Sequence, residues 1–318
     1  MPCVRMSCTC WKTAAWLLVV DTQILNILEL KIMTSTNDYK WLIPSSHNLG
    51  SKSIEEEKAL WDKSHEDYTN TAFSLTQDPK ICKNLIRPER SPGYDIPNSP
   101  DIKVLIPGCG SEIYLQKTLL EFCPQIGQVY CTDFSKTAIE KAQADWEKAD
   151  GDYRLNNQQI VFEEVDSTRI TEQKPEWNDK FDYVLLVNSV VSSEDKTNRE
   201  MIREFGKVLK PGGKIYGYFP TTLCFLEIAY FSRKHAHCVT EGFIDVYGNK
   251  VWDAEWQTAQ IYYSPLRLNR IFKEAGLQQL SLEMEFLDYE PFISMFKEMI
   301  DHDDPDIFLW HLLARYQK

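Results

Sequence analysis

Short apolar runs alternate along the chain with stretches in which apolar side chains recur at helical spacing. Runs bounded by turn-forming residues are typical of buried strands, and the spaced stretches are typical of amphipathic helices. The predicted strands lie at 104–106, 128–132, 159–165, 181–187, 214–219, 280–286 and 307–315. The predicted helices lie at 113–122, from Ser135 through Trp146, at 201–209, and from Ser264 to Gly276. This alternation predicts an α/β fold with a mostly parallel sheet and helices on both faces.

Residues 220–263 interrupt the alternation and are predicted to form an insertion. Phe225, Tyr230 and Phe231 indicate a helix. Two short runs, Phe243–Tyr247 and Lys250–Ala254, flank Gly248-Asn249, which is a hairpin signal. The aromatic side chains of this insertion either line a substrate pocket or form a local core.

The first hundred residues precede the sheet and divide into two parts. Residues 1–32 are apolar but interrupted by charges, which favours a disordered or amphipathic extension over a membrane-spanning helix. One interpretation is that translation starts at Met33. Residues 33–101 are predicted to form a helical lid and a linker. A capping box at Ser53 starts a helix that is expected to reach about Leu75, and a proline-rich stretch at 87–101 leads into the sheet.

The net charge and cysteine spacing of the chain indicate which kinds of binding partner to expect. The chain has 318 residues, and 35 Lys+Arg against 47 Asp+Glu give a net charge of −12. An acidic chain without a basic run is a poor match for nucleic acid or an anionic membrane, so we expect neither as a partner. Its nine cysteines lack metal-ligand spacing, so no metal site is predicted, and reduced thiols indicate a cytoplasmic chain. The sequence does not set the oligomeric state.

The candidate binding chemistry follows the first two strands. Gly108 and Gly110 flank Cys109 directly after the first strand, where glycine lets a backbone approach a ligand closely. Asp133 ends the second strand, at a separation from Gly110 close to the ~20 residues expected of a carboxylate that holds ribose hydroxyls. A glycine turn without a ligand and a helix-capping aspartate are the structural alternatives.

Several motifs together resemble the class I S-adenosylmethionine-dependent methyltransferases between about Ile102 and Tyr316. They are V-L-I-P-G-C-G, Y-C-T-D-F-S, E-E-V-D-S-T, F-D-Y-V-L-L-V-N-S, L-K-P-G-G-K-I and Y-S-P…E-A-G-L, in the family's order and spacing. The resemblance implies a Rossmann-like sheet of seven strands with the last strand antiparallel. It also implies a methyltransferase domain over 102–318 and S-adenosylmethionine as the cofactor. The form P-G-C-G is similar to that of the thiopurine and halide methyltransferase group.

The resemblance assigns roles to individual residues. Glycines of the first turn would pass the methionine part of the cofactor, the end of the second strand would hold ribose and adenine, and Asp166 with Ser167 would face the adenine amine. Asn188 and Ser189 would face the sulfonium, and Trp61 and Tyr68 resemble the family's lid helix. The implied cofactor-binding residues are Gly108, Cys109, Gly110, Asp133, Phe134, Asp166, Ser167, Asn188, Ser189, Tyr68 and Trp61.

Two positions depart from the family pattern. Ile106 replaces the usual acidic residue of the first motif, and Glu112 replaces the usual third glycine. The methionine amino group would then need another partner. Glu112 stands at the start of a helix, where a carboxylate is favoured, and is our candidate.

The function predicted from these residues is methyl transfer to a small-molecule nucleophile, with nitrogen or oxygen favoured over sulfur or carbon. No catalytic residue is assigned, since the sulfonium is already an activated donor. His235, His237 and Asp245 are candidates for a base in the insertion, each with a structural role as the alternative. Two other functions stay open. A nicotinamide-dependent oxidoreductase shares the glycine turn but has glycine where this chain has Ile113, and a non-catalytic protein could keep the fold.

Overall fold

The computed structural model describes residues 52–66, 75–149, 159–231, 237–253, 258–300 and 308–318, all within the compact unit Tyr39–Lys318. Structural statements below refer to these residues. The predicted extension at 1–32, Met33 and the lid residue Tyr68 lie outside them. The proposed domain boundaries therefore stay predictions.

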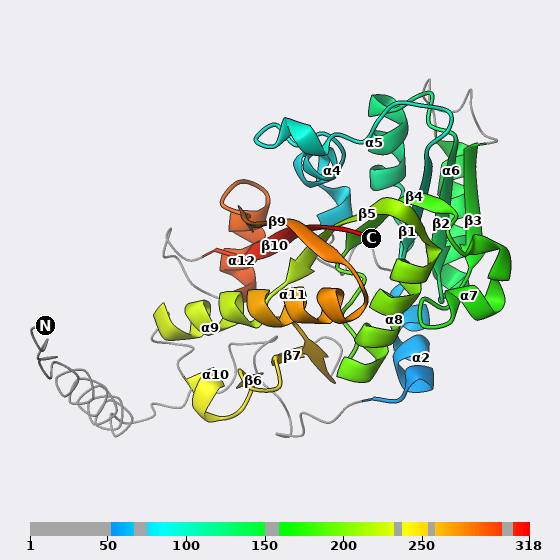
Figure 1. The fold of residues 1–318 in the computed structure, drawn as a ribbon. Coiled ribbons are helices and arrows are strands. Elements are labelled where there is room, and N and C mark those ends of the chain that lie inside the picture. Colours follow the sequence, from blue (N-terminus) through cyan, green and yellow to red (C-terminus); the bar gives the residue numbers. More distant parts are fainter. Residues whose placement is uncertain (1–51, 67–74, 150–158, 232–236, 254–257, 301–307) are drawn as a thin grey trace, which may run out of the picture. The chain divides into compact units, whose positions relative to one another are not determined.

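A seven-stranded sheet forms the centre of the described part of the chain (Figure 1). Its strand order is β3-β2-β1-β4-β5-β10-β9. The first five strands pair in parallel, and β10 pairs antiparallel with both β5 and β9. This confirms the predicted mostly parallel sheet with an antiparallel last strand. The strands are β1 (Lys103–Pro107), β2 (Gln128–Asp133), β3 (Ile160–Glu164), β4 (Phe181–Val187), β5 (Leu209–Pro220), β9 (Gln278–Phe286) and β10 (Trp310–Gln317).

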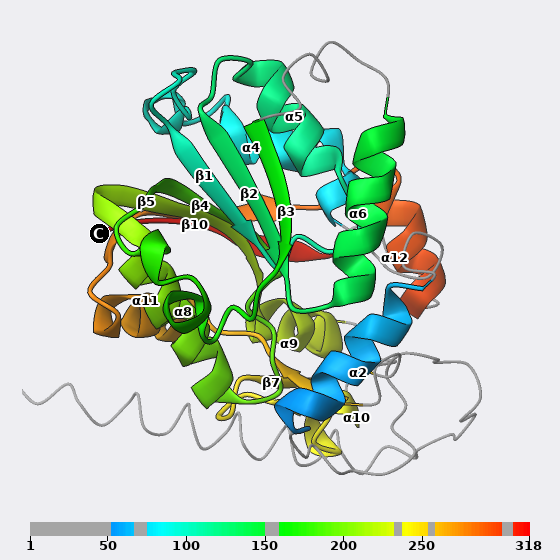
Figure 2. The ribbon, with the colours of Figure 1, turned by 90° about the vertical axis from the view of Figure 1, so that its right-hand side faces the viewer.

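Helices cover both faces of this sheet, which explains why its central strands are almost entirely apolar. Figure 2 shows α5 and α6 on one side of the sheet and α8 and α11 on the other. Each helix turns an apolar stripe inward, as in α6, where Ala138, Ala142 and Trp146 are buried as predicted. The helices around the sheet are α4 (Pro79–Ile86), α5 (Tyr114–Phe122), α6 (Lys136–Lys148), α7 (Ile170–Gln173), α8 (Asp195–Val208), α11 (Pro265–Glu274) and α12 (Phe292–Ile300).

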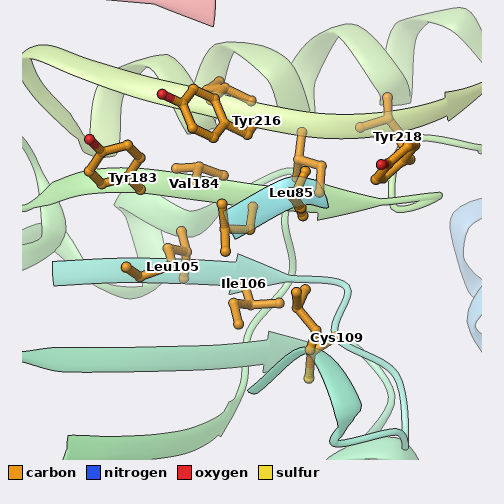
Figure 3. Close-up of a cluster of buried hydrophobic side chains, with 14 of the residues drawn as sticks. Leu85, Leu105, Ile106, Cys109, Tyr183, Val184, Tyr216 and Tyr218 are labelled. Carbon is orange, nitrogen blue, oxygen red and sulfur yellow. The ribbon is translucent and has the colours of Figure 1, made fainter. Parts of the chain in front are cut away.

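Side chains of β1, β4, β5 and α4 pack together in the hydrophobic core. Figure 3 shows Leu105 and Ile106 of β1 beside Val184 of β4 and Leu85 of α4. Ile106 is 3% exposed, so the position where the resembled family carries an acid is a core position here. An unpaired carboxylate would be costly at such a position.

The N-terminal region differs from its prediction. The helix expected to reach about Leu75 is α2 (Ile54–Ser64), which starts with the predicted capping box and ends at His65. Leu75 lies in a separate 3-10 turn. An unpredicted helix, α4, follows it, because Asp78 caps its N-terminus and Pro79 fixes its first turn. Helix α12 was also unpredicted.

Two strand boundaries differ as well. β5 starts at Leu209 rather than at 214, so the L-K-P-G-G part of the fifth motif belongs to the strand as an irregular stretch. Gly212 takes φ +79 there, which explains why a turn signal occurs inside a strand. β10 runs over Trp310–Gln317 rather than 307–315, because the antiparallel pairing with β5 continues to Gln317.

The insertion contains the predicted helix and hairpin. α9 (Thr222–Phe231) and α10 (His237–Thr240) precede a small sheet of β6 (Ile244–Asp245), β7 (Lys250–Asp253) and β8 (Thr258–Ile261). Figures 1 and 2 both show α2 and β7 at one end of the main sheet, and in Figure 2 the arrowheads of β1 and β2 point toward that end. Phe243 and Trp252 belong to a local core, so the structural alternative holds for part of the insertion.

Candidate functional site

A cavity of about 320 Å³ lies at the carboxyl ends of the central parallel strands. Its walls come from α2, the turns after β1 to β4, the insertion and β10. This is where an open parallel sheet places its ligands. The cavity brings together every predicted cofactor-binding residue that the structure describes: Trp61, Gly108, Cys109, Gly110, Asp133, Phe134, Asp166, Ser167, Asn188 and Ser189.

The glycine turn after β1 needs its glycines for two reasons. Gly108 and Gly110 have φ of +60 and +64, a region that residues with a Cβ rarely adopt. A Cβ added to Gly108 would lie 2.9 Å from the Ser189 Cβ, so the turn after β1 and the end of β4 touch directly. The amide of Cys109 donates to the Thr132 carbonyl at 2.9 Å, which fixes the turn against β2. The result is a narrow backbone cradle open to the cavity.

Asp133 at the end of β2 is tied to that same turn. Its carboxylate accepts from the Gly110 amide at 3.0 Å and from the Ser135 amide at 2.8 Å. Burial raises the pKa of this carboxyl to about 6, against the lowering effect of these amides. One amide reaches each oxygen, so each keeps acceptor capacity for a further donor.

The turn after β3 is held by its own hydrogen bonds. One Asp166 oxygen accepts from the Thr168 amide at 2.8 Å and from the Thr168 hydroxyl at 2.6 Å, and the other pairs with Arg169 at 3.3 Å. Ser167 is buried at the cavity wall between them. The Asp166 carboxylate is therefore held in one orientation, and its remaining lone pairs can accept hydrogen bonds at the cavity wall.

Asn188 at the end of β4 combines backbone strain with an unpaired side-chain atom. It has φ +51, which is uncommon outside glycine, and its amide donates to the Tyr218 carbonyl at 3.1 Å. Its side-chain Oδ1 is enclosed and has no hydrogen-bond partner among the described residues. Such features cluster at functional sites.

The carboxylate of Glu57 in helix α2 accepts hydrogen bonds from the loop after β4. Glu57 accepts from the Ser193 amide at 2.8 Å, from the Ser193 hydroxyl at 2.5 Å and from the Ser192 hydroxyl at 2.9 Å. Sequence analysis missed this contact because 136 residues separate Glu57 from Ser193. Glu57 therefore links helix α2 to the loop after β4, and this contact is called the Glu57 clasp below.

Replacing Glu57 with glutamine is expected to speed release of a bound cofactor product about tenfold. The change removes the negative charge that makes these hydrogen bonds strong. It should therefore weaken the contact between α2 and the loop after β4 by about 1.4 kcal/mol. Stopped-flow dissociation of S-adenosylhomocysteine and hydrogen exchange of Ile54–Ser64 would measure it. Glu55→Gln, an exposed acid in the same helical turn, is the matched control. Equal release rates in both variants would contradict the clasp.

His65 and Glu112 both border the cavity, and of the two only Glu112 was singled out from the sequence. His65 is 3% exposed, and burial lowers its pKa to about 4, so the ring is neutral at pH 7. Its Nδ1 lies 3.3 Å from the Ser111 hydroxyl. Glu112 is buried with one carboxylate oxygen lacking a partner, and burial raises its pKa. His65 has no sequence signal beyond its position at the end of α2, whereas Glu112 was predicted to contact the amino group of the cofactor.

Of the predicted base candidates of the insertion, only Asp245 has a side chain that the structure describes. Asp245 accepts from the Gly248 amide at 2.9 Å within the hairpin and is absent from the cavity wall, which supports its structural alternative. His235 and the side chain of His237 lie outside the described part of the chain. Within the described ranges, no group of acidic, His and Cys residues could hold a metal ion. No helix in those ranges is long and apolar enough to cross a membrane.

Comparison with known proteins agrees with this geometry. Residues 105–215 match a family model described as a methyltransferase domain. An S-adenosylmethionine-dependent methyltransferase of Anabaena variabilis has a similar fold, with 14% identity, a TM-score of 0.54, and coverage of 84% of this chain and 97% of that chain. The chain also matches N-methyltransferase NodS of Bradyrhizobium japonicum in complex with S-adenosyl-L-homocysteine, with 14% identity, a TM-score of 0.46, and coverage of 81% and 98%. No curated protein sequence matches the chain.

Proposed function

We propose that this chain, whose fold and family match support the class I S-adenosylmethionine-dependent methyltransferases, methylates a nitrogen or oxygen atom of a small molecule. One observation carries the proposal. The glycine cradle, the buried Asp133 and the strained Asn188 come from three strand ends and meet in one cavity. The thiopurine and halide subgroup, indicated only by P-G-C-G, stays a prediction.

The chemistry of the residues in this cavity supports the binding of this cofactor. A Cβ at Gly108 would press on the Ser189 Cβ, and both glycines have positive φ, so this turn suits a ligand that approaches the backbone closely, such as the methionine part. Asp133 would accept from the two ribose hydroxyls, and Phe134 would cover the adenine. Asp166 with Ser167 would take the adenine amine. Trp61 of helix α2, the proposed lid, would cover the bound cofactor.

Glu112 is the residue we assign to the amino group of the cofactor. The acid usual in the first motif is the core residue Ile106, and Glu112 offers a buried, unpaired carboxylate oxygen at the cavity wall. An ammonium group would supply both the missing hydrogen bond and a countercharge.

Glu112→Gln is therefore expected to weaken binding of S-adenosylhomocysteine about tenfold, or ~1.4 kcal/mol, by calorimetry. Binding of 5′-methylthioadenosine, which lacks the amino group, should stay unchanged. Glu121→Gln, on the exposed face of the helix α5 that follows Glu112, is the control. Equal weakening of both ligands by Glu112→Gln would show that this residue shapes the pocket and does not bind the amino group.

The chain's contribution to the reaction would be alignment and exclusion of water. The cofactor supplies an activated methyl group, and holding two reactants in line can contribute ~7–11 kcal/mol. The Glu57 clasp would close α2 over the reactants, which leaves room for a small molecule and little access for a polymer. The absence of nucleic-acid or membrane partners and the cytoplasmic location stay predictions.

Calorimetry on the full chain separates this function from its two alternatives. S-adenosylhomocysteine should bind and NAD should not, because Ile113 occupies the third glycine position of a dinucleotide turn. Binding of NAD alone would favour an oxidoreductase. Binding of S-adenosylhomocysteine without methyl transfer to amine, hydroxyl and thiol compounds would favour a non-catalytic protein.

A further inference from the structure

His311 of β10 is a buried imidazole without a hydrogen-bond partner. It lies opposite Pro220, at the carboxyl end of β5, and borders the cavity. The side chain is 6% exposed, and neither ring nitrogen has a hydrogen-bond partner among the described residues, with Nδ1 fully enclosed. Leaving a buried polar group unpaired costs about 1–3 kcal/mol, and Nε2, the ring nitrogen that is not enclosed, is the one available to a partner in the cavity.

His311 forms no ion pair with any charged residue that the structure describes. Glu285 lies beside it on β9, but its carboxylate accepts from the Asn84 amide at 3.1 Å and faces Lys80 at 3.9 Å. Burial alone lowers the pKa of His311 to about 4. The ring is therefore neutral at pH 7 and carries a free lone pair that can accept a hydrogen bond or a proton.

The wall around His311 differs in chemistry from the rest of the cavity. The charged lining residues Glu57, Lys58, Glu112, Asp133 and Asp166 all come from α2 or the strand ends that face the proposed cofactor site. From Pro220 onward, none of the described lining residues is charged. They are Pro220, Phe225, Val251, Trp252, Gln260, Tyr262, Leu309 and His311.

Flat aromatic rings make up much of this uncharged wall. Phe225 and Tyr262 stack with ring centroids 5.4 Å apart, and the Tyr262 hydroxyl donates to Gln260 at 2.9 Å. Trp252 also borders the cavity, and its indole N–H is enclosed without a partner. Ring faces of this kind favour flat apolar ligands over small aliphatic ones, which offer them little contact area.

We propose that this wall binds an uncharged aromatic methyl acceptor bearing an O–H or N–H group, and that His311 is the catalytic base that takes its proton. The inference rests on the proposed function. A lone pair of the acceptor oxygen or nitrogen forms the new bond to the methyl carbon, and the carbon–sulfur bond breaks with its electron pair left on sulfur. The acceptor's proton passes to the His311 lone pair, and the resulting imidazolium later releases it to solvent.

The test compares two chemical classes of probe on the full chain. The aromatic probes are 2-naphthol, tryptophol and aniline, and ethanolamine is the aliphatic amine. Transfer of a radiolabelled methyl group measures turnover, and calorimetry of 2-naphthol on the complex with S-adenosylhomocysteine measures binding without turnover. We expect transfer to at least one aromatic probe, none to ethanolamine, and 2-naphthol binding that depends on bound S-adenosylhomocysteine.

His311→Ala should lower kcat/KM for the aromatic probe at least a hundredfold, as expected for loss of a general base, while S-adenosylhomocysteine affinity stays within twofold. Added imidazole should restore at least a tenth of the wild-type rate, because the truncated side chain leaves space beside the cavity. Tyr230→Ala, on the exposed side of α9, is the control. A purely structural histidine would show no rescue by imidazole, and that result would overturn the catalytic role.

The outcomes separate the two proposals. Failure of the wild-type chain to bind S-adenosylhomocysteine would overturn the proposed function and this inference with it. Binding of S-adenosylhomocysteine with transfer only to ethanolamine, or with no transfer and no 2-naphthol binding, would overturn this inference alone.

Discussion

Asp133→Ala is expected to weaken S-adenosylhomocysteine binding about a hundredfold. Two hydrogen bonds to a charged acceptor contribute about 1.5 kcal/mol each, and ~2.8 kcal/mol corresponds to a factor of a hundred. The loss should apply equally to 5′-methylthioadenosine, which keeps the ribose, and this distinguishes the ribose carboxylate from Glu112. Calorimetry with both ligands measures it.

The same substitution removes acceptors from the Gly110 and Ser135 amides, so folding needs its own control. Asp133→Asn keeps the shape and one acceptor oxygen, and should keep the turn while binding both ligands more weakly than the wild type. Thermal unfolding and far-ultraviolet circular dichroism would verify the fold of each variant. A folded Asp133→Asn variant with wild-type affinity for both ligands would remove the ribose role.

The pH dependence of binding should report the same carboxyl. Its pKa of about 6 in the ligand-free chain means that it takes up a proton as the pH falls below 6. The protonated group offers fewer acceptor sites to ribose, so affinity should fall ~10-fold between pH 7 and pH 5. Asp133→Asn, which does not titrate, should lose most of this dependence. A wild-type affinity that is flat over this range would contradict the titration of Asp133.

The folding stability should change with pH in the opposite direction to the binding affinity. Burial raises the folded-state pKa from 3.8 to about 6, so the folded chain binds a proton more tightly than the unfolded chain between these values. The stability associated with this group is therefore full below pH 3.8 and is lost as the pH rises through 6. Cofactor binding at neutral pH would act against that loss, because hydroxyl donors favour the charged carboxylate.

The sequence predicted the features that depend on neighbouring residues. Strand β4 is a continuous apolar run, and the glycine turn and Asp133 each follow a strand directly, so local pattern was sufficient to place them at one sheet edge. The helix start at Ser135 and the helix end at Gly276 were predicted for the same reason, and the structure shows Ser135 as an N-cap and Gly276 with a positive φ. These are short-range signals with a direct physical cause.

Features that depend on distant contacts were not predictable in this way. Glu57 looks like any exposed acid of a helix's first turn until Ser193 is brought to it by folding. His311 lies in an apolar run, and its unpaired state is decided by what β5 and β9 place around it. Helix α4 was hidden in a stretch near prolines that also signal a linker. Tertiary packing determines each of these outcomes, which local periodicity does not encode.

Gly108→Ala is expected to lower the free energy of unfolding by about 2 kcal/mol and to prevent cofactor binding. A left-handed backbone costs a residue with a Cβ about 1–2 kcal/mol, and the new methyl group would press on the Ser189 Cβ. Because the cradle is the point of closest ligand approach, its displacement should affect binding more than stability. Urea unfolding and calorimetry with S-adenosylhomocysteine measure the two effects.

Two companion variants separate conformational strain from crowding at Gly108. Gly93→Ala, where a Cβ meets nothing within 4 Å and φ is not positive, should leave both properties unchanged. Adding Ser189→Gly to Gly108→Ala removes the contact and should restore only the part of stability lost to crowding. Full recovery in the double variant would show that the left-handed backbone contributes nothing, whereas no recovery would assign the whole loss to it. Binding that survives in the single variant would mean that the ligand does not approach the cradle, and the cofactor site proposed here would be wrong.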